Sequence, residues 1–70
     1  MKFSEQTLTK VLVNLKCCGY MGRATRRFST KERGEILNIL EKRGLIDEKG
    51  QPTLKAMPII TANLNLCDNH

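Results

Sequence analysis

The fold of this chain is decided by residues 29–46, which read STKERGEILNILEKRGLI. Ser29 followed three residues later by Glu32 is a capping box, in which each side chain satisfies a backbone amide at the start of a helix. Apolar residues at helical spacing then form one stripe, and Gly44 lies at the position of a helix stop. The stripe consists of Ile36, Leu37 and Leu40, with Ile39 on its margin. The pattern predicts a helix that begins after Ser29 and ends before Gly44.

Residues at the C-terminal end and in the interior of this helix also bear on its stability. Lys42 and Arg43 place positive charge at the carboxyl end, where the helix dipole favours it. Leu45 is positioned for the apolar contact of a Schellman-type stop. Gly34 in the helix interior costs about 0.8–1 kcal/mol relative to alanine. It either marks a close approach to another helix or has no packing role.

A first helix is predicted over residues 5–18. Ser4 is a good N-cap, and Phe3 and Leu8 occupy the two positions of a hydrophobic staple around it. Apolar residues then recur at three- and four-residue steps, so the helix has one face suited to burial. That face is formed by Leu8, Val11, Leu12, Leu15 and Cys18.

The last third of the chain is predicted to be a turn followed by an irregular β element. Residues 47–50 have the composition of a turn. Thr53 is placed to cap a single helical turn, which Pro58 then interrupts. Residues 60–66 alternate between apolar and polar side chains, which is the period of a strand. We expect this tail to pair with residues 44–47; the alternatives are pairing with a second chain or no regular structure.

Length and composition limit the class of protein. The chain has 70 residues and 8.0 kDa, and 12 Lys and Arg against 7 Asp and Glu give a net charge of +5. We expect one domain over residues 1–70, with 60–70 as an extended pairing tail and an aliphatic core too small for a large enclosed pocket. No secretion signal or membrane-spanning run is evident, and three cysteines are an odd number. A reducing, cytoplasmic setting is therefore expected.

The cysteines and the single histidine do not predict a metal or catalytic site. Cys17 and Cys18 are adjacent, so they point to different sides of a helix. Cys67 and His70 form one Cys-x-x-His pair, whereas zinc sites usually have closely spaced ligands at both ends. No phosphate-binding loop or nucleophile grouping is present. We expect no enzyme activity, no metal and no cofactor.

Positive charge is concentrated in residues 23–33. Arginine binds phosphate bidentately, hydroxyl groups add contacts, and a helix N-terminus attracts anions. Residues 19–28, just before the capping box, are either a short helix or an ordered basic loop. Asn38 is the best candidate for a base contact from the exposed face of the helix. The candidate nucleic-acid-binding residues are Arg23, Thr25, Arg26, Arg27, Ser29, Thr30, Lys31, Arg33 and Asn38.

Two segments resemble known regulatory domains. Residues 36–46 resemble the end of a helix-turn-helix or winged-helix domain, and residues 47–56 resemble a turn-then-Pro-Thr-x-Lys-Ala element of small phage and prophage regulators and antirepressors. The resemblance implies a mainly α, winged-helix-like domain with a short irregular β element at its C-terminal end, in a bacterial or phage-infected cell. The sequence departs from this pattern because the helix exposes Glu32, Glu35 and Glu41, whose carboxylates repel phosphate.

These observations lead to two expected functions. The first is a small regulatory module that binds nucleic acid, DNA rather than RNA, through phosphate contacts. The alternative is a protein-interaction module, a phage-type inhibitor or adaptor, that docks the arginines on an acidic partner and adds residues 60–66 to its sheet. A homodimer fits either function, because the core is small and helix-turn-helix proteins commonly bind paired half-sites. No membrane partner is expected.

Overall fold

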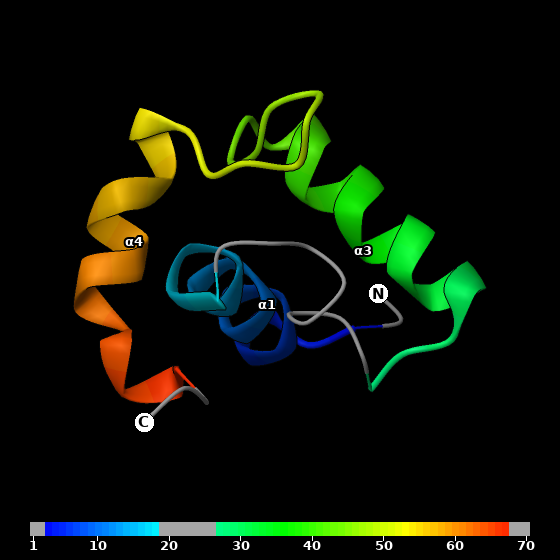
Figure 1. The fold of residues 1–70 in the computed structure, drawn as a ribbon, viewed down its shortest axis with the longest axis horizontal. Coiled ribbons are helices and arrows are strands. Elements are labelled where there is room, and N and C mark those ends of the chain that lie inside the picture. The colour runs from blue at the N-terminus through cyan, green and yellow to red at the C-terminus, as the bar shows by residue number, and fades with distance from the viewer. Residues whose placement is uncertain (1–2, 19–26, 68–70) are drawn as a thin grey trace.

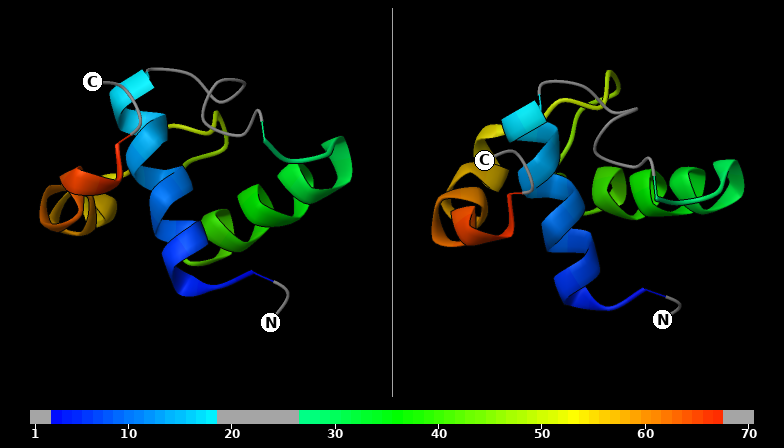
Figure 2. Two further views of the ribbon diagram at one scale, coloured as in Figure 1. Left: turned by 90° about the horizontal axis from the view of Figure 1, so that it is seen from below. Right: turned by 60° about the horizontal axis from the view of Figure 1, so that its bottom comes forward.

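Helices account for most of the computed structural model, which describes residues 3–18 and 27–67 (Figure 1). Its elements are α1 (Glu5–Cys18), α3 (Thr30–Lys42), the 3-10 helix η1 (Leu54–Ala56), α4 (Met57–Ala62) and the 3-10 helix η2 (Leu64–Leu66). The helix α1 lies in the middle, with α3 on one side and α4 and η2 on the other (Figures 1 and 2). The mainly α fold predicted from the sequence is confirmed, and within the described residues no strand forms.

The start of α1 follows the predicted capping pattern. The Ser4 Oγ accepts the backbone N–H of Thr7 at 3.1 Å, and Phe3 and Leu8 are both buried as a staple requires. The Phe3 ring also meets the Phe28 ring edge-on, with centroids 6.3 Å apart. This contact joins the beginning of α1 to the segment that leads into α3.

The helix α1 is buried on more than the one predicted face. Leu12 and Val13 are both 0 % exposed, and Asn14 is 3 % exposed. Residues 11–15 are consecutive and all buried, which is more than one helical turn. The core therefore surrounds α1, because α3 covers one side of it and α4 with η2 covers the other. Cys18 ends the helix, but its side chain lies outside the described residues.

Asn14 is a buried polar side chain that joins α1 to the C-terminal part of the chain. Its amide nitrogen donates to the backbone carbonyl of Lys10 at 2.8 Å and to that of Leu66 at 3.3 Å. Burying an amide without partners is costly, so these bonds fix where η2 lies against α1.

Both predicted ends of α3 are present. The Ser29 Oγ accepts the N–H of Glu32 at 3.2 Å, and the Glu32 Oε1 accepts the N–H of Ser29 at 3.1 Å, which completes the capping box. At the other end Gly44 has φ of 75°, and the N–H of Leu45 donates to the Leu40 carbonyl at 3.0 Å. This is the Schellman geometry, in which a glycine adopts a left-handed conformation and the next residue is buried.

An ion pair links the end of α3 to the start of α1. The Arg43 guanidinium donates to both carboxylate oxygens of Glu5, each at 2.8 Å. This hydrogen bonding lowers the pKa of the Glu5 carboxyl and raises the pKa of the Arg43 guanidinium. The two residues are 38 positions apart, so the pair depends on the packing of α3 against α1.

The predicted turn at residues 47–50 is confirmed. The Asp47 Oδ1 accepts the N–H groups of Lys49 and Gln51, each at 2.9 Å, and Gly50 has φ of 81°. The chain folds back on itself here, and Ile46 and Pro52 form an isolated antiparallel bridge. Within the described residues, this bridge is all that forms of the expected β element.

The prediction of a strand over residues 60–66 is wrong. Residues 57–62 form α4 and residues 64–66 form η2, so the tail neither extends nor pairs with residues 44–47. The buried positions are Ala56, Ile60 and Cys67, which follow the spacing of a helix that packs on α1. The alternation over residues 60–66 has the period of a strand, but packing against α1 selected the helix.

The single helical turn predicted after Thr53 is present as η1, with Thr53 at its N-cap position, but the predicted side-chain cap and the predicted interruption at Pro58 are wrong. Thr53 provides no side-chain cap; its hydroxyl donates to the Gly44 carbonyl at 2.6 Å and so ties η1 to the end of α3. Pro58 does not interrupt a helix but lies in the first turn of α4. A missing N–H is harmless there, because the first N–H groups of a helix have no partner within it.

Candidate nucleic-acid interface

The predicted interface lies at the N-terminal end of α3. Only Ile36, at the middle of this helix, and Leu40, near its end, are buried. The first turns therefore extend away from α1, as both views in Figure 2 show. The backbone N–H groups at this end attract anions because of the helix dipole.

Six of the nine predicted residues lie within the described part of the chain. Arg23, Thr25 and Arg26 lie outside it. Arg27, Ser29, Thr30, Lys31 and Asn38 are exposed, and Arg33 is half-buried. The structure thus brings Arg27 to Arg33 together at one end of α3, whereas Asn38 lies two turns further along the helix.

The cations at this end make no ion pairs with carboxylates of the described residues. Arg27, Lys31 and Arg33 are without such a pair, in contrast to Arg43 with Glu5. The Arg33 Nε is buried, and it has no hydrogen-bond acceptor among residues 3–18 and 27–67. These groups keep their capacity to bind an anion from outside the molecule.

The hydroxyl of Ser29 contributes to the helix cap, so its stability effect can be measured separately. Replacing Ser29 by alanine removes the acceptor of the Glu32 N–H, and we expect a loss of about 1 kcal/mol in the free energy of unfolding. Urea denaturation followed by circular dichroism measures this loss. The matched control is Thr30→Ala, which removes an exposed hydroxyl next to the cap. Equal stabilities of the two variants would contradict the capping role.

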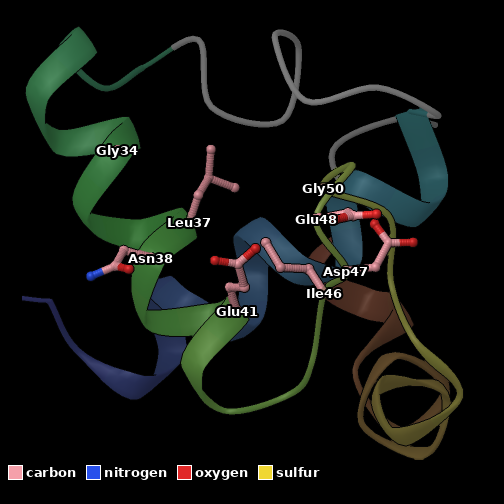
Figure 3. A pocket seen from close by; sticks show the side chains of 8 residues that line it. All are labelled: Gly34, Leu37, Asn38, Glu41, Ile46, Asp47, Glu48 and Gly50. Carbon is pink, nitrogen blue, oxygen red and sulfur yellow. The ribbon is translucent and has the colours of Figure 1, made fainter.

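A shallow hollow lies between α3 and the loop that follows it (Figure 3). Its volume is about 230 Å³. It is lined by Gly34, Leu37, Asn38, Glu41, Ile46, Asp47, Glu48 and Gly50. The hollow was not predicted, because nothing local in the sequence indicates that the turn at residues 47–50 folds back beside α3. Its sequence signals were Asn38 and Glu41 on the exposed face of the helix and the turn composition of residues 47–50.

The residues around the hollow bear on the base contact that was predicted for Asn38. Three of the residues that line it carry carboxylates: Glu41 from α3, and Asp47 and Glu48 from the loop. Carboxylates repel the phosphates that flank any base, so they oppose a nucleic-acid backbone along this part of α3. The electrostatics favour phosphate contact at the N-terminal end of the helix and disfavour base contact by Asn38.

Neither a metal site nor a membrane-spanning helix is found among the described residues. In the described ranges no three His, Cys, Asp or Glu residues are grouped so that they could hold a metal ion. No helix in those ranges combines the length and the apolar character needed to cross a membrane. No protein-family model, curated protein or solved structure matches this chain.

Proposed function

We propose that this protein binds nucleic acid, DNA rather than RNA, through phosphate contacts at the N-terminal end of α3. One observation carries the proposal: Arg27 and Lys31 are exposed, have no carboxylate partner among the described residues, and flank the amide end of a helix that projects from the core. Cations and helix amides in one place form a phosphate site. Arg23 and Arg26 precede them in the sequence and carry the same charge.

The proposal includes a winged-helix-like organisation and a regulatory role. The winged-helix-like organisation is supported by the loop at residues 46–52, which comes after α3 and is closed by one β-bridge, as a wing follows a recognition helix. Asp47 and Glu48 in this loop repel phosphates, so in this proposal the loop does not contact DNA as a wing would. In this proposal, α3 approaches the phosphates with its first turn and does not lie along the groove.

An electrophoretic shift with random duplex DNA across a salt series tests the proposal. Each phosphate contact contributes about one unit to the slope of log affinity against log salt, so the double variant Arg27→Ala/Lys31→Ala is expected to lower the slope by about two. The matched control is Lys16→Ala/Lys49→Ala, which removes the same charge from exposed lysines on α1 and on the loop.

The possible results distinguish phosphate contact at the N-terminal end of α3 from attraction of DNA by the net charge of the whole chain. If both double variants lose the same slope, the net charge of +5 and not the end of α3 is responsible. If the wild-type chain shifts no DNA at low salt, nucleic-acid binding is contradicted. The alternative function, in which the same cations dock on an acidic protein, would then be the better explanation.

A further inference from the structure

The exposed face of α3 carries opposite charges at its two ends. Lys31, Gly34, Asn38 and Glu41 recur at three- and four-residue steps, and all four are exposed. Lys31 and Glu41 are ten residues apart, which corresponds to about 15 Å along a helix. Arg27 lies close to Lys31 in the sequence, and Asp47 and Glu48 line the same hollow as Glu41. One end of the stripe is therefore positive and the other negative.

Gly34 lies in the middle of this stripe, and no packing contact among the described residues requires a glycine there. Apart from the neighbouring residues and backbone of α3 itself, a Cβ added there would have no atom of the described residues within 4 Å, so these residues do not require its small size. Glycine inside a helix lowers helix stability relative to alanine. A backbone that another helix approaches closely from outside would need this residue.

We propose that α3 pairs with α3 of a second copy of this chain, with the two helices antiparallel about a two-fold axis level with Ile36. Residue 36 is midway between Lys31 and Glu41 and also midway between Gly34 and Asn38. The axis therefore places Lys31 of each copy against Glu41 of the other. It also places the Asn38 side chain of each copy over Gly34 of the other.

The charges on the exposed stripe of α3 indicate that a second copy of this chain is what binds at the hollow, because the stripe is complementary to itself. The stripe is complementary to itself only when the helices are antiparallel, because like charges meet when they are parallel. Leu37 lines the hollow and adds apolar surface near the axis. This pairing does not rest on the proposed nucleic-acid binding. Where both occur, they compete, because Lys31 takes part in each.

Sedimentation equilibrium of the full chain at low salt tests the pairing. The wild type is expected to approach twice the 8.0 kDa of one chain as its concentration rises to about 1 mM. Lys31→Glu and Glu41→Lys each turn two attractive contacts into repulsive ones, so each is expected to weaken association about tenfold. The double variant Lys31→Glu/Glu41→Lys keeps the net charge of +5 and restores the pairs with reversed sign.

Restored association in the double variant supports the antiparallel arrangement, and failure to restore it overturns the proposal. A control, Lys16→Glu, changes the net charge as Lys31→Glu does but at an exposed site on α1, and it should not weaken association. A wild-type chain that stays at 8.0 kDa at every concentration also overturns the proposal.

Gly34→Ala provides an independent test, because it should stabilise the single chain and at the same time weaken the pairing of two chains. The added methyl group favours the helix and is expected to raise the melting temperature by about 4 °C. It also obstructs the close approach at two symmetric places, so the dissociation constant of the pair is expected to rise about tenfold. A more stable variant that associates as tightly as the wild type would overturn the proposed contact at Gly34.

Discussion

Replacing Leu12 by alanine is expected to lower the free energy of unfolding by about 3 kcal/mol. Leu12 is 0 % exposed in the middle of α1, the helix that α3, α4 and η2 surround. Its truncation removes apolar contacts and leaves a cavity that the helices on both sides cannot close. A domain of this size has a small free energy of unfolding, so the midpoint of the cooperative unfolding transition should shift to a low urea concentration.

Urea denaturation followed by circular dichroism measures the effect of Leu12→Ala. The matched control is Leu54→Ala, the same substitution at a leucine that is 89 % exposed on η1. We expect the control to change the free energy of unfolding by less than about 0.5 kcal/mol. Similar losses at the two positions would contradict the central position of α1 in the core.

The substitution Asn14→Asp is expected to cost about 3 kcal/mol at neutral pH. It keeps the shape of the side chain but replaces the donating amide by a carboxylate that faces two backbone carbonyls, those of Lys10 and Leu66. A buried carboxylate oxygen held against two carbonyl oxygens is strongly unfavourable, because all three carry negative charge. The effect should therefore exceed the loss of the two hydrogen bonds alone.

The cost of Asn14→Asp should depend on pH with a defined sign. Burial raises the pKa of the introduced carboxyl above its value in the unfolded chain. The folded variant is therefore most stable below the unfolded pKa, where the carboxyl is neutral and able to donate, and it loses stability as the pH rises through the folded pKa. Urea denaturation from acid to neutral pH, with the exposed Asn65→Asp as control, measures this trend. A loss independent of pH would contradict it.

The candidate interface was only partly predictable. The capping box at Ser29 and Glu32 fixes where α3 begins, so it also fixes where the helix amides and the cations from Arg27 to Arg33 lie together. What the sequence did not indicate is how far this end projects from the core. Nor did it indicate that a turn with two carboxylates folds beside Asn38. Both features depend on how α3 and the loop pack, and neither leaves a periodic signal.

Local interactions determined the elements whose ends were predicted correctly. Ser4, the Ser29 capping box, the Gly44 stop and the Asp47 turn each involve residues at most five positions apart, so their hydrogen bonds are available before any packing occurs. The sequence by itself therefore determined α1, α3 and the turn that follows α3.

Only the tertiary structure decided the rest. Residues 60–66 alternate with the period of a strand, and packing of α4 and η2 on α1 selected the helical form instead. The burial of Asn14 and the pairing of Glu5 with Arg43 likewise need elements that are distant in sequence. The physical reason is that burial depends on which surfaces meet, and a pattern of a few residues does not specify its partner.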